Sequence, residues 1–517
     1  MALLPPRPST SHPRHNPIPP HPLHPDNPQH PPQPITTNPT MNALMPWITP
    51  EIFTTLTALL LITTQALGLL RTQTQAYLIT LIALTLATLT TLLIPPHTQS
   101  YWAEQYLWND SIRTTKLLFL LLALWITWLT HQNPHELTPR LPEFHALTLL
   151  AFTGLLLLPS AQSFPTLFIS LELITVTLYI LVSYHRTHPP ALEAGIKYLI
   201  IGSVASAFMI MGIAYLFGFT GTLQFKTITT HNVWSSTPAP LWIAPLFLLA
   251  GIAFKASLVP FHAWAPDVYQ GTNHPTTALL ATASKAAAVL LLFFLFTGPL
   301  RLLLSYPSFL HIFLTLGLLS ILIGNFSALH QPNLKRLLAY SGIGHAGFMA
   351  LPLTHFDTAG QTALLTYLLT YLLASITTFT VLTHVTPQND TPITQYTALA
   401  KRNPLLALAL TLALTSMAGI PPLPGFTGKW LIFTHLWQHG HHLTLAIALI
   451  STVVALAYYI AIIKTLFSST PPHLTDPPPT PIHLPLSTTC LITLLSATLV
   501  ILGLWPTPLL HITASLL

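Results

Sequence analysis

Charged residues are scarce in this sequence. Asp, Glu, Lys and Arg make up 6% of its 517 residues, against roughly 25% in typical soluble domains. The mean hydropathy is +0.61. Because so few charged groups cannot cover the surface of a chain this long, the composition excludes water as its main solvent. It predicts a protein that crosses a membrane many times.

Cysteine and nucleotide-binding motifs are also scarce. The single cysteine, Cys490, lies in an apolar run, which excludes an intramolecular disulfide and a cysteine-rich metal centre. The sequence contains neither a GxGxxG fingerprint nor a P-loop, so it predicts no nucleotide cofactor or metal in this chain. The formal net charge of +6 comes from scattered residues, and the absence of a basic cluster excludes a nucleic-acid partner.

The first forty residues differ from the rest because they are rich in proline and histidine and poor in apolar residues. Such a segment cannot bury a core and is expected to be disordered or polyproline-like. Its histidines are irregularly spaced, which favours a compositional bias over a metal site. Met41 begins a stretch typical of a translation start, which favours a mis-assigned start codon at Met1.

Beyond this tail, the chain is a series of apolar segments of about twenty residues, the length that crosses a hydrocarbon core of about 30 Å. The turns between them contain the proline, asparagine and histidine that end helices. We predict fourteen spans, near residues 51–70, 77–95, 114–130, 145–160, 164–184, 194–218, 240–266, 275–298, 307–327, 335–354, 361–385, 404–437, 442–467 and 486–505.

The distribution of lysine and arginine between the two sets of loops predicts the orientation, since cytoplasmic loops are enriched in both. With an even number of spans, both termini are then expected outside. The loop charges expected on the cytoplasmic side are Arg71, Arg140, Arg186, Lys197, Lys335, Arg336, Lys401, Arg402 and Lys464, and those on the other side are Arg113, Lys116, Lys226 and Arg301.

Four ionisable residues fall inside the predicted spans: Glu172, Lys255, Lys285 and Lys429. An ionisable group at bilayer depth costs roughly 2.5–3.5 kcal/mol on insertion scales, and such residues usually mark an ion or proton route. The alternative is a structural ion pair or a side chain that extends to the interface. Lysine suits proton transfer better than arginine because a buried ammonium can release its proton, whereas a guanidinium keeps it. We take Glu172 and Lys255 as the candidate pair.

Prolines interrupt two of these spans, at Pro260 and at Pro421, Pro422 and Pro424. Proline removes helix hydrogen bonds, and a membrane tolerates the resulting break only where the backbone lines a polar cavity. Lys255 lies five residues before Pro260, and Lys429 lies five residues after Pro424. Spans seven and twelve run in opposite directions, so the two breaks predict an inverted repeat. Ordinary proline kinks are the alternative.

Four stretches carry a resemblance to a known family: FKASLVPFHAWAPDVYQG, ATASK, LKRLLAYSGIGHAGF and AGIPPLPGFTGK. In this order and spacing they resemble subunit N of bacterial NADH:quinone oxidoreductase, or respiratory complex I, a family of antiporter-like subunits. The resemblance covers nearly the whole chain from about Met41. The lysine after GFTG favours subunit N over subunit M, in which a glutamate stands at this place. The long lateral helix of subunit L is not found at the C-terminal end of this sequence.

The resemblance implies an all-α membrane protein of about 14 transmembrane helices, with two inverted five-helix repeats that each contain a broken helix. We therefore expect five parts. They are a tail at 1–40, three helices at 41–140, a first repeat at 141–300, a second repeat at 301–470, and a loop with the last span at 471–517.

The resemblance also implies roles for single residues. Glu172 pairs with Lys255 in the broken seventh span, Lys285 is the central relay, and Lys429 is the terminal lysine of the broken twelfth span. His345 matches a histidine between these lysines, and this role depends on the resemblance alone, since an isolated histidine is more often a packing residue.

Four further residues are secondary candidates. Glu193 and Lys197 stand four apart at the start of a span, an order that favours a helix ion pair. The resemblance places both in a family motif, so a gating role stays open. His262 and Asp267 flank the first break, where we expect them to cap the backbone or to hold a loop.

The implied function is proton translocation coupled to electron transfer from NADH to quinone, with NADH, FMN, iron–sulfur clusters and quinone in partner subunits. The implied partners are an antiporter-like subunit M and a small subunit of the K type, in the inner membrane of a bacterium. Three alternatives stay open: a subunit of a multisubunit cation/proton antiporter, the same module in a membrane-bound hydrogenase or a ferredoxin-driven photosynthetic complex, and a passive scaffold without a proton path.

Overall fold

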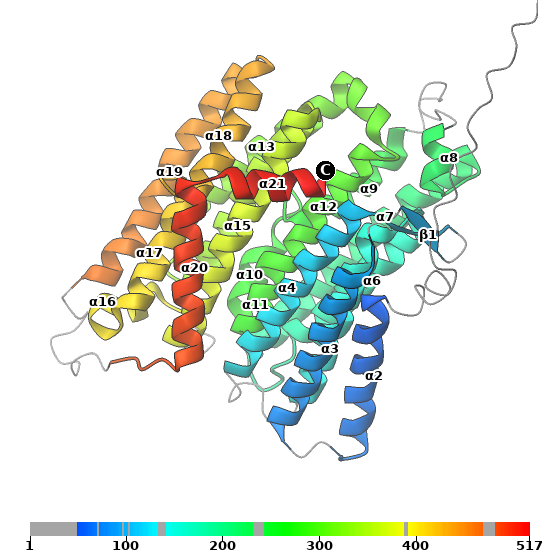
Figure 1. Cartoon of the computed structure of the whole chain (residues 1–517). Coiled ribbons are helices and arrows are strands. Elements are labelled where there is room, and N and C mark those ends of the chain that lie inside the picture. Colours follow the sequence, from blue (N-terminus) through cyan, green and yellow to red (C-terminus); the bar gives the residue numbers. More distant parts are fainter. Residues whose placement is uncertain are drawn as a thin grey trace, which may run out of the picture. The chain divides into compact units, whose positions relative to one another are not determined.

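The computed structural model describes residues 49–69, 72–95, 98–101, 104–132, 141–230, 242–386, 391–468 and 481–517 (Figure 1). The predicted tail at 1–40 lies outside these residues. The described chain is helical almost throughout, as expected. The exception is a short antiparallel hairpin, β1 (Gln99–Tyr101) and β2 (Tyr106–Trp108), which the all-α prediction missed.

The first half of the described chain forms long helices. Proline in the first turn, where its missing N–H has no helical partner, starts several of them, including α2, α6 and α7. The helices are α2 (Pro50–Ala66), α3 (Gln73–Leu93), α4 (Asp110–Gln132), α5 (Leu141–Leu157) with η3 (Leu158–Ser160), α6 (Phe164–Val182), α7 (Pro189–Thr220) and α8 (Phe225–Thr230).

The span predicted at 240–266 consists of two helices, α9 (Ile243–Ala256) and α10 (Trp264–Gly271). Helix α9 ends where Ser257 takes a left-handed conformation with φ of 57°. The backbone N–H groups of Ser257 and Leu258 then close the helix on the carbonyls of Phe254 and Ala253. Lys255 therefore lies in the last turn of a helix that stops inside the span.

The next span contains a wide turn. Helix α11 (His274–Leu279) passes through a π-helical segment, η6 (Leu280–Ser284), into α12 (Lys285–Thr297). Such π segments occur often at functional sites, because the extra residue redirects the side chains around it. Lys285 is the first residue after this segment.

The second half of the described chain also contains a broken span. The span predicted at 404–437 is also broken, into α17 (Pro404–Ala418) and α18 (Pro424–Gln438), and Gly419 between them has φ of 84°. The other elements are η7 (Arg301–Ser305), α13 (Pro307–Ala328), α14 (Leu334–Ala350), η8 (Leu351–Thr354), α15 (Thr358–Val385), η9 (Ile393–Tyr396), α16 (Leu399–Arg402), α19 (His442–Phe467), α20 (Leu486–Leu504) and α21 (Thr507–Leu516).

Among the described residues, ten helices are long and apolar enough to cross a membrane, and they coincide with ten of the predicted spans. Two more predicted spans are the broken helices, which are built from shorter pieces. The last two, at 51–70 and 335–354, correspond to α2 and α14, which have 17 residues each. A multi-pass membrane fold is thus present, and the total of fourteen spans stays a prediction.

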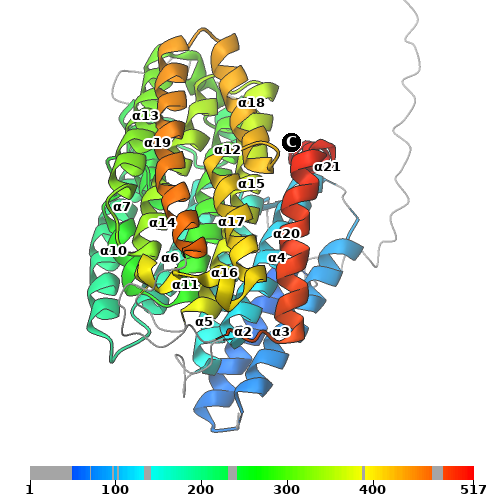
Figure 2. The same cartoon turned by 90° about the vertical axis from the view of Figure 1, so that its left-hand side faces the viewer.

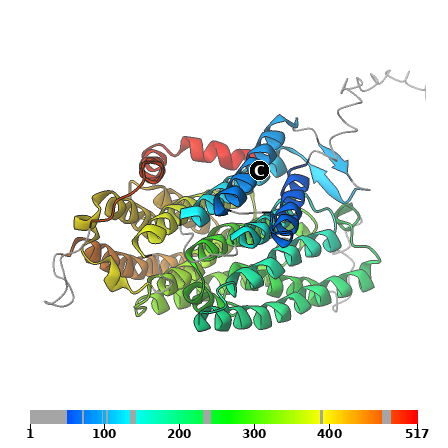
Figure 3. The same cartoon turned by 90° about the horizontal axis from the view of Figure 1, so that it is seen from below.

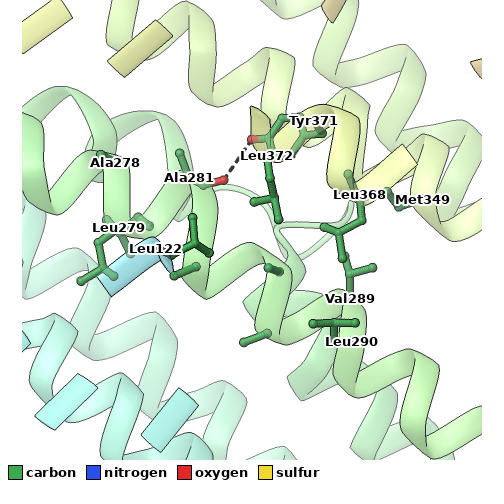
Figure 4. Close-up of a cluster of buried hydrophobic side chains, with 14 of the residues drawn as sticks. Leu122, Ala278, Leu279, Ala281, Val289, Leu290, Met349, Leu368, Tyr371 and Leu372 are labelled. Carbon is green, nitrogen blue, oxygen red and sulfur yellow. Dashed lines mark hydrogen bonds between the residues drawn. The ribbon is translucent and has the colours of Figure 1, made fainter. Parts of the chain in front are cut away.

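The span formed by α11, η6 and α12 is the most enclosed of these ten, with 94% of it buried, whereas only 33% of α7 is buried. Its apolar neighbours include Leu122 of α4 and Leu372 of α15 (Figure 4). Figures 2 and 3 show that α20 and α21 lie on the same side of the bundle as α2–α4. The centre of the bundle is therefore the region around α12, where Lys285 lies.

The short helix α21 was not predicted. It lies across the bundle rather than along it (Figure 1) and contacts α4 and α15. Ser111 of α4 donates a hydrogen bond of 2.5 Å to the carbonyl of Leu516, near the end of α21.

Candidate functional site

Helix α14 lies at the centre of a row of buried polar groups. The ammonium Nζ of Lys285 donates a 2.6 Å hydrogen bond to the carbonyl of Gly342 on α14. His345 lies three residues further along, and the ring of Phe348, after another three, faces Nζ of Lys429 at 5.2 Å. Six helical residues span roughly 9 Å. The helix thus places the three sites at regular intervals along one face.

His345 is hydrogen-bonded at both ring nitrogens. Nδ1 lies 2.7 Å from the Tyr367 hydroxyl of α15, and Nε2 lies 3.1 Å from the Tyr459 hydroxyl of α19. Tyr459 in turn shares a hydrogen bond with Ser341. A neutral imidazole donates from one nitrogen and accepts at the other, and a hydroxyl does both. This arrangement can therefore exist with either direction of its hydrogen bonds.

Lys285 is 2% exposed and is surrounded by neutral groups. Its ammonium also lies 5.7 Å from the centre of the Tyr371 ring, and Tyr371 is fixed by a 3.1 Å hydrogen bond to the carbonyl of Ala281 (Figure 4). A Cβ atom at Gly342 would lie 2.8 Å from Nζ of Lys285. The close approach of the ammonium to α14 therefore requires glycine at this position.

Lys429 is 2% exposed and reaches back across the second helix break. Its ammonium donates a 2.8 Å hydrogen bond to the carbonyl of Ala418, the last residue of α17. A Cβ atom at Gly419 would lie 2.8 Å from Cδ of this lysine. The lysine thus binds one of the carbonyls that the end of a helix leaves without a helical partner.

Lys255 and Glu172 approach each other without forming a direct ion pair. Nζ of Lys255, which is 7% exposed as a residue, donates a hydrogen bond to the hydroxyl of Thr175 on α6. Glu172, one turn earlier on α6, accepts a 2.6 Å hydrogen bond from the hydroxyl of Ser206 on α7. Lys255 therefore binds α6 one turn away from Glu172, and each of the two predicted partners has a neutral hydroxyl as its direct partner.

Glu172 is only half-buried, in contrast to the three lysines. It follows the same face of α6 as Ile169, Val176 and Ile180, whose exposed fractions are 63%, 50% and 46%. The carboxylate thus lies where the row reaches the outer surface of this chain.

The secondary candidates form a separate network at one end of the bundle. Lys197 pairs with Glu193 and Asp267 at 2.7 Å each, and Arg336 of α14 pairs with Asp267 at 2.6 Å. The predicted helix ion pair of Glu193 and Lys197 is present. Asp267 links α7, α10 and α14 through its ion pairs with Lys197 and Arg336. It therefore holds this segment through side-chain partners and not by capping the backbone. A cavity of about 200 Å³ lies beside these residues.

His262 lies in the break between α9 and α10. Its carbonyl accepts a 3.0 Å hydrogen bond from the N–H of Ala265, but its ring nitrogen Nδ1 is buried and makes no hydrogen bond to the described residues. The ring also interacts with the backbone of Pro260 in the break, and the expected capping role stays a prediction.

Two lysines assigned to loops from the sequence are buried in helices. Lys335 is 0% exposed and donates a 2.7 Å hydrogen bond to the carbonyl of Thr272. Lys116 of α4 forms a 2.6 Å ion pair with Glu51 of α2, with both side chains at most 6% exposed. Their positions near predicted span ends made them look like loop charges, and only the packing of distant helices reveals that they are enclosed.

A group of histidines at another end of the bundle was also missed. Asp357, the N-cap of α15, faces His435 of α18 and His439, which directly follows α18, at 3.2 and 3.6 Å. Burial and the neighbouring His439 lower the pKa of His355, whose ring stacks on that of His439. Burial alone would raise the pKa of Asp357, but the N–H of Gly360 and the ring of His435 lower it. The sequence signal was four histidines within the eight residues HLWQHGHH.

The sequence and the fold of this chain match known proteins. Residues 161–455 match the family model described as "NADH:quinone oxidoreductase/Mrp antiporter, TM". NADH-quinone oxidoreductase subunit N of Desulfitobacterium hafniense is 36% identical over 411 residues, which cover 76% of this chain and 82% of the relative. The corresponding subunit of Moorella thermoacetica is 34% identical, with the same coverage of both chains.

This chain belongs to the NADH-quinone oxidoreductase subunit N family. A chain of respiratory complex I from Thermus thermophilus agrees, with a TM-score of 0.76 and 32% identity, over 90% of this chain and 100% of that chain. A membrane-bound sulfane sulfur reductase matches with a TM-score of 0.77 at 22% identity, which concerns the fold alone. The family assignment made from the sequence motifs is thus confirmed.

Proposed function

We propose that this chain, as an antiporter-like membrane subunit of an NADH:quinone oxidoreductase, moves protons along the row formed by Glu172, Lys255, Lys285, His345 and Lys429. The observation that carries this proposal is the spacing along α14, where Gly342, His345 and Phe348 meet Lys285, two tyrosines and Lys429 in turn.

The partners of the central lysines favour a change of protonation. Lys285 and Lys429 donate to backbone carbonyls, and within the described residues neither forms an ion pair. A buried charge without a counter-charge costs several kcal/mol, so burial disfavours the ammonium relative to the neutral amine. A change in the surrounding charges can then shift the proton.

His345 would connect the two lysines. Each of its ring nitrogens already has a hydroxyl partner, Tyr367 on one side and Tyr459 on the other. A proton that arrives at one nitrogen can be released from the other, and the hydrogen bonds then reverse. Ser341, next to Gly342, extends this chain of hydroxyls toward Lys285.

The arrangement of elements supports the inverted repeat. Helices α5, α6, α7, the broken α9/α10 and the span ending in α12 form one set of five, within the predicted repeat at 141–300. Helices α13, α14, α15, the broken α17/α18 and α19 form a second set, within 301–470. The fourth member is broken in each set. We propose fourteen spans in total, with 41–140 and 471–517 adding three and one.

The partners of the chain are then other membrane subunits of the complex, and we propose an antiporter-like subunit M and a small subunit of the K type. We place the complex in the inner membrane of a bacterium. NADH, FMN, iron–sulfur clusters and quinone would be bound by partner subunits, since this chain offers the protonatable row and no nucleotide motif.

The test is Lys285→Met in the intact complex, reconstituted into lipid vesicles. Methionine keeps most of the side-chain volume but cannot hold a proton. We expect NADH oxidation coupled to this pathway and the resulting pH gradient to fall at least about tenfold. Lys285→Arg should also fail, because a guanidinium does not release its proton.

Lys464→Met is the matched control, because Lys464 is exposed near the end of α19 and outside the row. The Lys464→Met complex should pump protons at the same rate as the wild-type complex. If Lys285→Met assembled normally and pumped with the same number of protons per electron, the chain would be a scaffold, and the proposal would be wrong.

A further inference from the structure

A cluster of possible metal ligands lies outside the proton row. It consists of Asp357, His435 and His439, and one ligand atom of each lies within 4.8 Å of the others. We propose that these three residues form a binding site for a divalent transition metal ion with the preferences of zinc. The site is independent of the proposed proton route.

The distances between the possible ligand atoms are close to those of an occupied site. Oδ1 of Asp357 lies 3.2 Å from Nε2 of His435, and its Oδ2 lies 3.6 Å from Nε2 of His439. Zinc binds nitrogen and oxygen at about 2.0–2.2 Å in a tetrahedron, which places neighbouring ligands roughly 3.3–3.5 Å apart. Small side-chain shifts would therefore be sufficient to close the site on an ion.

The tautomer of His439 is already the one that a metal requires. Its Nδ1 lies 2.9 Å from the carbonyl of His435. A carbonyl only accepts hydrogen bonds, so the proton of the neutral ring must be on Nδ1. The lone pair is then on Nε2, the nitrogen nearest to Asp357. A second ring nitrogen bonded to a backbone carbonyl is typical of histidine ligands, because it fixes both tautomer and orientation.

His435 provides a second, independent indication. Its side chain is 1% exposed, and its Nδ1 is buried without a hydrogen bond to any described residue. Its Nε2 donates to the carbonyl of His355 at 2.8 Å and lies beside Asp357. These contacts hold Nε2 in the direction of Asp357, with the His355 carbonyl beside it. A metal bound there would replace the proton that the two oxygens share, and the proton of the neutral ring would be on Nδ1.

The backbone fixes the three ligands in place. His435 lies in the last turn of α18 and His439, four residues later, caps its C-terminal end, so their rings project from the same side of the helix end. Asp357 caps α15 by accepting a 2.8 Å hydrogen bond from the N–H of Gly360. The carboxylate is 49% exposed and His439 is 25% exposed. An ion can therefore enter from the surface while His435 closes the inner side.

The ligand types select the metal. Imidazole suits zinc, copper and nickel, whereas magnesium and calcium prefer sites made of oxygen alone. With two imidazoles and one carboxylate, the site provides three protein ligands and leaves a fourth position for water, which is the composition of open zinc sites. Occupation would tie the start of α15 to the end of α18, the helix that also carries Lys429.

The experiment measures zinc bound by the intact purified complex after equilibrium dialysis against zinc ions. All samples keep the full chain, so zinc bound by the histidines of residues 1–40 is the same in each and cancels in the comparison. The unmodified complex should bind one zinc more than the double variant His435→Gln with His439→Gln. Asp357→Asn should weaken this site by at least about tenfold, since asparagine keeps the helix cap but removes the charge.

His442→Ala is the matched control, because His442 is exposed, lies outside the three-residue group and packs against the ring of Trp437. This variant should bind zinc like the unmodified complex. NADH oxidation without zinc verifies that each variant assembles. Equal zinc stoichiometry and affinity in the double variant would overturn the proposal, and so would a loss in His442→Ala as large as that in Asp357→Asn.

Discussion

The ammonium of Lys429 donates a 2.8 Å hydrogen bond to the carbonyl of Ala418 across the break between α17 and α18. Ala418 is the last residue of α17. At this end of a helix the carbonyls have no helical partner, and the negative end of the helix dipole lies here. Lys255 occupies the equivalent electrostatic position by another route, because it lies in the last turn of α9. In both broken helices an ammonium is thus stabilised at the carbonyl end of the first half.

Gly342→Ala tests the close approach of Lys285 to α14. The added Cβ would lie 2.8 Å from Nζ of Lys285, so the ammonium must move away from the Gly342 carbonyl. Since a shift of about 1 Å can reduce a positioned reaction about 100-fold, we expect proton pumping to fall by roughly 10- to 100-fold. Gly218→Ala, whose Cβ meets nothing within 4 Å, is the control. Equal pumping by both variants would contradict the role of this contact.

Tyr367→Phe and Tyr459→Phe test the hydroxyl connections of His345. Each change removes one hydroxyl partner of the ring and keeps the aromatic packing. If protons pass through His345, each variant should slow pumping several-fold, and the two changes together should not be additive, because either one interrupts the same path. Tyr215→Phe, on α7 away from the row, serves as the control. Pumping rates in lipid vesicles distinguish the outcomes.

Lys255→Met and Glu172→Gln test the coupling through α6. Lys255 donates a hydrogen bond to Thr175, which lies one turn after Glu172 on α6, and Glu172 accepts one from Ser206 of α7. Each single variant should severely reduce pumping, and the double variant should be less than additive if the two residues act as one switch. Pro260→Ala should be milder because it leaves the charges in place. Additive losses would mean that Glu172 and Lys255 act separately.

Lys116→Met tests the buried ion pair with Glu51. The two groups are 2.6 Å apart and nearly inaccessible, so removing the lysine leaves a carboxylate buried without a partner. Breaking such a pair typically costs about 3–5 kcal/mol. We expect a lower thermal stability of the complex, and the addition of Glu51→Gln should recover much of it. Unchanged thermal unfolding of Lys116→Met would show that water replaces the lysine.

A reporter after Leu517 tests the predicted orientation. The lysine and arginine bias of the loops places both termini outside the cytoplasm. A periplasmic reporter such as alkaline phosphatase should therefore be active there, and one fused after Arg402 should be inactive. Activity of the second fusion alone would mean that the whole orientation is reversed, and activity of both fusions or of neither would mean that the number of spans between these points is miscounted.

The sequence determined the fold class, the family and the identity of the deep charges. Apolar segments of membrane-spanning length are visible without any structure, because the bilayer imposes a fixed length on each span. The prolines at 260 and 421–424 located both helix breaks, since proline cannot donate a helix hydrogen bond. Lys285 and Lys429 could be picked out because charge is rare in such segments.

The tertiary structure decided which groups meet. Nothing in the spacing of the sequence reveals that Lys285 reaches the carbonyl of Gly342, or that His345 lies between Tyr367 and Tyr459. It also decided that Glu172 bonds to Ser206 rather than directly to Lys255. These contacts join helices that are far apart in the chain. The physical reason is that hydrophobic patterning places helices in the membrane, whereas side-chain packing between them sets their rotation and neighbours.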